Sequence, residues 1–188
     1  MLNKVKNILP KSSLKTLYMT LIQSHILYGL LIWGNSRHIN TVTKSQKRYI
    51  RLINGKSYRH HTEPLLKQCN ILKVTDQYLL NVTCFMNQLK YHKLPTSFEY
   101  LDYFTLRHSH RTRHVTLARS KAPRTCYTAS LPLHKFPKVW NELDPQFHEL
   151  KSCNLLKKRL QGSLIDNYLQ VIHCDNLTCS QCYPQIEN

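Results

Sequence analysis

Carboxylates and glycines are scarce in this sequence. Its 188 residues include only 10 Asp and Glu against 27 Lys and Arg, and only 4 glycines. So few glycines exclude a collagen-like chain, and neither a glycine-rich phosphate loop nor a Gly-x-Ser-x-Gly turn occurs. No two aspartates are adjacent, and the carboxylates are scattered singly. A two-metal polymerase or nuclease site, whose ions lie about 4 Å apart and need converging carboxylates, is therefore not expected.

A long apolar run is also missing. The most apolar stretch, between His25 and Ser36, is bounded by polar residues on both sides. A membrane span needs about 20 apolar residues, so we expect no membrane partner. The N-terminal residues lack the apolar core of a signal peptide, and 7 cysteines at irregular spacing do not suggest a disulfide framework. These features favour a cytoplasmic or nuclear location.

Positive charge is the strongest signal in the composition. The formal net charge is +17, and residues 1–61 hold 11 Lys and Arg without a carboxylate. Residues 107–138 hold 8 more, again without a carboxylate. Such an excess repels itself in a compact chain and is most simply relieved by a polyanion, usually nucleic acid. Two separate regions of the chain are therefore candidates for binding one.

Helical periodicity dominates the first hundred residues. Apolar residues three and four apart predict a helix over 14–33, with Ser12 or Ser13 as its N-cap. The second half of this helix is apolar nearly all round, which predicts burial on several sides, with Trp33 in the core and Gly29 allowing a neighbouring element to approach closely. Further helices are predicted over 40–53, after Thr62 as N-cap, over 74–91 and after Ser152.

The predicted fold class is mainly α, with four or five helices around one core. The helical period is lost in a basic segment, which predicts extended chain, turns and one hairpin there. A short tail rich in cysteine follows the last helix. The predicted division is a helical region at 1–106, a basic extended or hairpin segment at 107–138, a C-terminal helical segment at 139–172 and a Cys-rich tail at 173–188.

The candidate nucleic-acid-binding residues form two groups. In the helix over 40–53 the cations share one face, and no carboxylate four residues away offsets their repulsion. The second group belongs to the basic segment, and both groups either meet phosphates or are solvated surface. Tyr49 and Tyr58 are candidates for stacking on an unpaired base. The cations concerned are Lys44, Lys47, Arg48, Arg51, Arg107, Arg111, Arg113, Arg119, Lys121 and Arg124.

The best candidate metal ligands lie in the tail. Cys179 and Cys182 are separated by two residues, so their thiolates can bind one zinc ion, and four residues separate Cys174 from Cys179. A closed zinc site needs four ligands, however, and the tail offers three cysteines. Two interpretations stay open, a zinc site and cysteines that bind nothing. No other cofactor is expected.

Several segments together resemble one family. They include "LKTLYMTLIQSHILYGLLIWGNS", "SQKRYIRLING", "HTEPLLKQCNILKVTDQYLLNVTCFM" and "PRTCYTASLPLHKFPKVWNELDP". In order and spacing they resemble the region after the polymerase core in reverse transcriptases of non-LTR retrotransposons, of the LINE type and Jockey-like. The likeness covers roughly residues 10–168.

This resemblance implies that region 1–106 is thumb-like and that the chain grips template RNA and primer or target DNA by their backbones. In such proteins the chemistry belongs to the fingers and palm, whose Tyr-x-Asp-Asp motif has no counterpart here. It therefore implies a truncated thumb and post-thumb part of an RNA-directed DNA polymerase, inactive by itself, with the missing fingers and palm as a partner. Two alternatives remain, an independent zinc-dependent nucleic-acid-binding module and a structural fragment that binds nothing.

Overall fold

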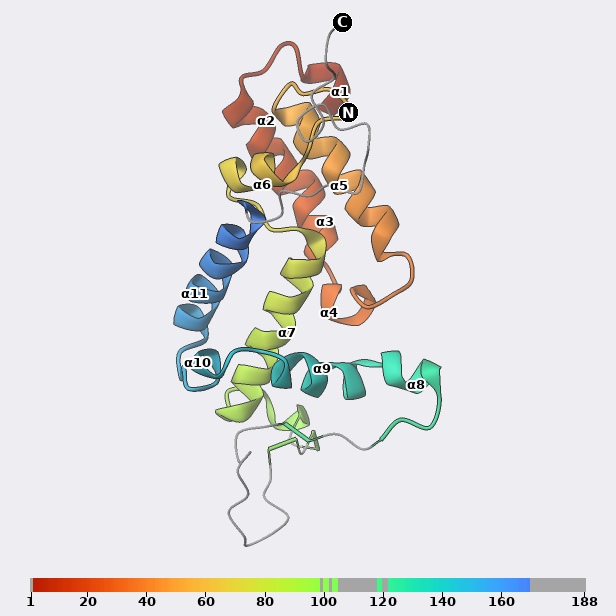
Figure 1. Ribbon diagram of the computed structural model, residues 1–188, viewed down its shortest axis with the longest axis vertical. Helices are drawn as coiled ribbons and strands as arrows, with labels where there is room; N and C mark the ends of the chain where they lie inside the picture. Colours follow the sequence, from red (N-terminus) through yellow and green to blue (C-terminus); the bar gives the residue numbers. More distant parts are fainter. Residues whose placement is uncertain (1, 99, 102, 105–117, 120–121, 170–188) are drawn as a thin grey trace, which may run out of the picture. The chain divides into compact units, whose positions relative to one another are not determined.

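The computed structural model describes residues 2–98, 100–101, 103–104, 118–119 and 122–169 (Figure 1). These residues are mainly helical, as the sequence predicts, and no strand occurs among them. They divide into two compact units. The described residues of unit 1 are 2–30, 37–77 and 161–169, and those of unit 2 are 31–36 and the described residues within 78–160. No helix in the described ranges is both long enough and apolar enough to cross a membrane.

The elements of unit 1 come from both ends of the chain. Helix α7 (Val74–Lys90) begins in this unit and ends in unit 2, whereas α11 (Cys153–Asp166) begins in unit 2 and ends here. The remaining elements are α1 (Leu2–Val5), α2 (Lys11–Leu17), the π-helix η1 (Tyr18–Gln23), α3 (Ser24–Leu27), α5 (Ile39–Ile53), α6 (Glu63–Cys69) and the 3₁₀-helix η3 (Asn167–Leu169).

The predicted helix over 14–33 is present but not continuous. It begins at Lys11 with Pro10 in the N-cap position, so the N-cap predicted at Ser12 or Ser13 is wrong. Gly29 has φ of 62°, a left-handed conformation that an α-helix does not contain, and it separates α3 from α4 (Leu30–Trp33). Gly29 therefore interrupts the helix, whereas the sequence predicted one continuous helix.

Burial around this break differs from the prediction. Tyr28 is 84% exposed and Ile32 is 79% exposed, although the sequence predicted burial on several sides. Trp33 is only half-buried. The α-helix is interrupted at Gly29, so Tyr28 and Ile32 do not continue the buried stripe of the preceding turns, whereas Leu30 is buried. Leu14, Tyr18 and Ile26, which precede the break, do lie in the core.

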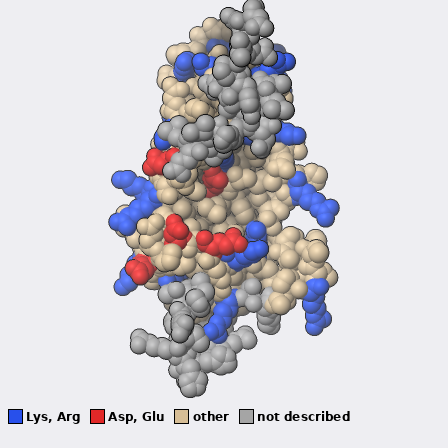
Figure 2. All heavy atoms as spheres, viewed as in Figure 1, with Lys and Arg blue, Asp and Glu red and all other residues tan. Residues whose placement is uncertain are grey.

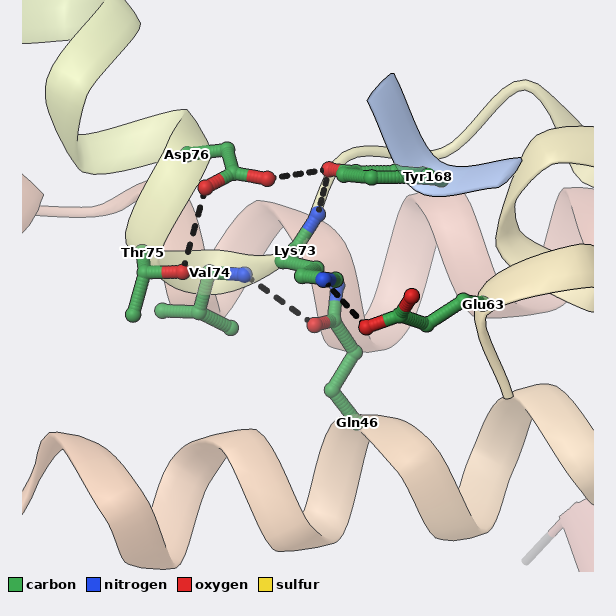
Figure 3. A network of polar contacts seen from close by, with 7 residues as sticks. All are labelled: Gln46, Glu63, Lys73, Val74, Thr75, Asp76 and Tyr168. Carbon is green, nitrogen blue, oxygen red and sulfur yellow. Dashed lines mark hydrogen bonds and ion pairs between the residues drawn. The ribbon is translucent and has the colours of Figure 1, made fainter. Parts of the chain in front are cut away.

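A buried glutamine links three segments of unit 1. Gln46 on α5 is 1% exposed, and its amide nitrogen donates to the Leu72 carbonyl oxygen at 2.8 Å and to the Tyr18 hydroxyl at 3.2 Å. Its amide oxygen accepts from the Val74 backbone N–H at 3.1 Å, at the start of α7 (Figure 3). Tyr18 in turn donates to the side chain of Gln23 at 2.7 Å. Burial raises the pKa of Tyr18 to about 12.

A second polar network ties the C-terminal part of unit 1 to the start of α7 (Figure 3). The Tyr168 hydroxyl donates to the Asp76 carboxylate and accepts from the Lys73 backbone N–H at 2.9 Å. The Lys73 ammonium lies 2.6 Å from the Glu63 carboxylate and 4.6 Å from the centre of the Tyr168 ring. Burial, reinforced by the hydrogen bond to Asp76, raises the pKa of Tyr168. The residues near 168 are thus an integral part of this unit.

The secondary structure of the segment 107–138, in unit 2, differs from the prediction. Of that segment the structure describes 118–119 and 122–138, and from Cys126 onward it is mostly helical, not extended or a hairpin. Thr125 and Thr128 form a capping box at the start of the first helix, and Pro132 occupies the first position of the next, where a missing N–H costs nothing. The elements of unit 2 not yet given are η2 (Thr96–Phe98), α8 (Cys126–Ser130), α9 (Pro132–Asn141) and α10 (Pro145–His148).

Trp140 is the centre of the core of unit 2, as predicted. Its side chain is fully buried, and its indole stacks on the His148 ring at 4.8 Å between centroids. A ring nitrogen of His148 lies 2.8 Å from the Trp140 carbonyl oxygen. Phe104 packs edge-on against the same indole at 5.9 Å.

The predicted N-cap at Ser152, before α11, is also present, because the Leu155 N–H lies 3.5 Å from the Ser152 hydroxyl.

Candidate nucleic-acid interface

The basic face predicted on α5 is present, and its four cations differ in exposure. Lys44 and Arg48 are exposed, whereas Lys47 and Arg51 are half-buried. The opposite face packs in the core through Ile50 and Ile53, along with Gln46. The amphipathic pattern of the sequence therefore placed these cations on the correct side of the helix.

The end of α5 is shaped by a left-handed glycine. Gly55 has φ of 63°, its N–H donates to the Leu52 carbonyl oxygen at 3.2 Å, and the Lys56 N–H donates to the Arg51 carbonyl oxygen at 2.9 Å. This pair of hydrogen bonds is the Schellman motif, which satisfies the last carbonyls of a helix and turns the chain away from its axis. As a result the loop after α5 returns past the last turn of the helix and brings Tyr58 beside Arg51.

A hollow of about 860 Å³ lies between this loop, the last turns of α5 and the residues after α1. Among the described residues, four cations line it and no carboxylate does. Tyr58, which is 82% exposed, lines it as well. We call this site the basic hollow, and its cations are Lys6, Arg48, Arg51 and Lys56.

Contacts with other described residues hold the side chain of Arg51 in place, alone among the four cations of the basic hollow. Its Nε donates to the His60 carbonyl oxygen at 2.7 Å, and its guanidinium carbon lies 5.6 Å from the centre of the Tyr58 ring. Burial lowers the pKa of Arg51, and Tyr58 opposes this shift, but an arginine stays charged at neutral pH. Arg51 therefore fixes the loop, and it is not free to follow a ligand as Lys6 or Lys56 is.

The carboxylates of unit 1 are engaged elsewhere. The three in its described part are Glu63, paired with Lys73, Asp76, which accepts from Tyr168, and Asp166, whose carboxylate lies 3.6 Å from the Lys67 ammonium. None of the three lines the basic hollow. On the face drawn in Figure 2, blue Lys and Arg side chains extend from the surface at several places and the red carboxylates form a few separate patches. The described part of unit 1 thus leaves the charge of the basic hollow unbalanced.

The second predicted group of cations is only partly described. Arg119 and Arg124 are exposed residues of unit 2, and the Arg119 backbone N–H donates to the Tyr103 carbonyl oxygen at 2.9 Å. Neither lines the basic hollow. Arg107, Arg111, Arg113 and Lys121 lie outside the described residues.

The predicted zinc ligands Cys174, Cys179 and Cys182 also lie outside the described residues. Within the part of the chain that the structure describes, no group of three or more His, Cys, Asp and Glu side chains is placed to hold a metal ion. The described cysteines are free thiols: one is buried, one is exposed and two are half-buried. The two half-buried thiols, Cys84 and Cys153, are neighbours, and burial raises the pKa of Cys84 to about 12.

Two lining cations of the basic hollow were not among the sequence candidates. Lys6 and Lys56 lie outside the helix over 40–53, so helical periodicity gives no reason to group them with Arg48. The sequence feature that could have indicated both lysines is that they belong to residues 1–61, which hold no carboxylate. The turn at Gly55 could also have indicated that the following residues come back to the helix.

Comparisons of this chain with protein-family models, with curated proteins and with solved structures gave no match.

Proposed function

We propose that this chain binds RNA or DNA by the sugar-phosphate backbone, with the basic hollow as the principal contact. The observation that carries this proposal is the convergence of four cations on a surface hollow that no carboxylate of the described residues lines. Three of the four, Lys6, Arg48 and Lys56, are exposed and able to reach a phosphate. Lys44 and Lys47 extend the positive charge along α5. Contacts of this kind give affinity without reading base edges.

The sequence resemblance extends this proposal to the kind of protein in which the binding takes place. We propose that the chain is the thumb and post-thumb part of a LINE-type reverse transcriptase, without polymerase activity of its own. Template RNA and primer or target DNA would be its ligands, and the fingers and palm its partner. A coding sequence upstream of Met1 that encodes a Tyr-x-Asp-Asp motif would support this setting; primer extension by this chain alone would contradict it.

Salt dependence of binding tests the proposed contact. Each phosphate that a cation neutralises lowers the slope of log K against log salt by about 0.9 on duplex DNA and about 0.7 on a single strand. Changing Lys6, Arg48 and Lys56 together to Gln should therefore flatten the slope by up to about 3 units on a duplex and about 2 on a single strand. Fluorescence anisotropy at several salt concentrations measures it.

A matched control removes the same charge elsewhere. Lys157, Lys158 and Arg159 are three exposed cations on α11, and none of them lines the basic hollow. Changing all three to Gln lowers the net charge by the same amount and should leave the slope within about half a unit of wild type. Equal slopes for the two triple variants would show that binding follows net charge and would refute the basic hollow as the contact.

The tail cysteines are proposed separately as a zinc site. Zinc measured per chain, and its loss when Cys179 and Cys182 are changed to Ser, tests this directly. If the zinc-free protein no longer binds RNA while the variant of the basic hollow still does, the chain is better described as a zinc-dependent nucleic-acid-binding module.

A further inference from the structure

Tyr58 is placed unusually for a large aromatic residue. Its ring is 82% exposed, yet it lines the basic hollow and one side of it lies near the Arg51 guanidinium. Arg51 is itself held by its hydrogen bond to the His60 carbonyl oxygen. Arg51 therefore supports the Tyr58 ring from one side, and the ring stays exposed on the surface of the basic hollow.

The other tyrosine that the sequence offered for stacking is placed differently. Tyr49 is half-buried on α5 and does not line the basic hollow. Of these two tyrosines, Tyr58 is therefore the one that combines an exposed ring with a position among the cations of the basic hollow. The structure thus distinguishes between two residues that the sequence left equivalent.

We infer that the basic hollow takes an unpaired nucleotide, whose base stacks on the Tyr58 ring while the adjoining phosphates contact Lys6, Arg48 and Lys56. The inference rests on the proposed function, because it specifies which form of nucleic acid the same site prefers. A cation over one face of an aromatic ring is an attractive neighbour, and the opposite face remains available to a flat base. Stacking of this kind tolerates every base, since each has a π-face.

The site should discriminate against a duplex. Inside a double helix both faces of each base are covered by neighbouring bases, and exposing one costs a few kcal/mol of unstacking. The phosphates remain accessible in a duplex, so the cations alone do not distinguish the two forms. The preference for single strands should therefore reside in Tyr58 and disappear when its ring is removed.

Three probes test this preference with the full chain. They are a fluorescein-labelled single strand of about 12 nucleotides, the same strand with abasic sites, which keeps the phosphates, and a blunt duplex of the same length. We expect wild type to bind the single strand about 5- to 100-fold more tightly than the abasic strand, in line with the contribution of base stacking to single-strand binding.

Three variants complete the experiment. Tyr58→Ala should weaken binding of the single strand about 5- to 100-fold and leave the abasic strand unchanged, while Tyr58→Phe should stay within about twofold of wild type because the ring is kept. Tyr127→Ala removes a ring that is 74% exposed but lies on α8, outside the basic hollow, and should have no effect. Because Tyr58 is so exposed, its removal should not disturb folding, and circular dichroism checks this.

The outcomes distinguish failure of the stacking inference from failure of the proposed function. Equal binding of the normal and abasic strands by wild type, or tighter binding of the duplex than of the single strand, overturns the stacking inference alone. An unchanged affinity in Tyr58→Ala overturns it as well. If wild type binds none of the three probes, the proposed function fails and this inference fails with it.

Discussion

Replacing Gln46 tests whether its hydrogen bonds organise unit 1. Gln46→Met keeps the volume of the side chain and removes all three hydrogen bonds that the amide makes. The Leu72 carbonyl oxygen and the Val74 N–H are then left in a buried region without these partners. Each buried group that loses its partner costs about 1–3 kcal/mol, so the loss of two should lower the unfolding free energy by about 2–6 kcal/mol. The Tyr18 hydroxyl keeps its hydrogen bond to Gln23, so it adds little to the loss of unfolding free energy.

Urea unfolding followed by circular dichroism measures this loss. With a slope of about 2 kcal/mol per molar urea, the midpoint should fall by about 1–3 M. Gln68→Met is the matched control, because Gln68 is exposed on α6 and the same chemical change there should shift the free energy by less than about 0.5 kcal/mol. If Gln46→Met unfolds at the same urea concentration as Gln68→Met, the reasoning about buried hydrogen bonds is refuted.

A second substitution at this position adds a dependence on pH. In Gln46→Glu the protonated carboxyl can still donate to the Leu72 carbonyl oxygen, whereas the ionised form cannot and would be buried. Burial should therefore raise the pKa of this Glu in the folded state above its unfolded value of about 4.3. The stability of the variant relative to wild type should be greatest below about pH 4.3 and should fall as the pH rises toward the folded pKa. A difference that does not change with pH would contradict this.

Three further predictions concern single side chains. His92 has φ of 51° after the last turn of α7, so His92→Gly should raise the unfolding free energy by about 0.5–1 kcal/mol in urea by removing the cost of a left-handed side-chain-bearing residue. Tyr168→Phe keeps the ring but removes the hydroxyl that Asp76 accepts from, and should lower the unfolding free energy by about 1–2 kcal/mol. Burial, and secondarily a neighbouring thiol, raises the pKa of Cys84 to about 12. At pH 8 only about one such thiol in ten thousand is ionised, so peptide mapping after iodoacetamide treatment should show the exposed Cys126 modified well before Cys84.

Helices whose stability depends on a regular apolar stripe were predictable from the sequence. The helices over 40–53 and 74–91 were expected within one residue of where α5 and α7 lie, because their apolar residues recur at helical spacing and their ends carry clear stop signals. The burial of Trp140 and the N-cap at Ser152 were predicted for similar reasons. The two helices and this N-cap depend on neighbours along the chain, and Trp140 is buried because a large apolar ring gains most from leaving water.

The errors arose where local signals compete. Gly29 was interpreted as a point of close packing within one helix, but its left-handed backbone ends α3. The segment after Thr125 was predicted to be extended because its helices are short and contain prolines, yet Pro132 occupies a first-turn position where proline is tolerated. In both cases the residue type allowed two conformations: Gly29 could continue a helix or end it, and Pro132 could break a helix or begin one. So few residues show no clear periodicity, and the sequence therefore did not decide between them.

The sequence by itself determined that this chain is mainly helical, strongly basic and without a carboxylate in its first 61 residues. It also placed Lys44, Lys47, Arg48 and Arg51 on one face of α5, because helical spacing fixes which residues share a face. Only the tertiary structure decided that Lys6 and Lys56 join Arg48 in one hollow, and that Tyr58 stands exposed beside Arg51. The physical reason is that a helix face follows from local geometry, whereas a hollow is formed by segments brought together by a turn and a shared core.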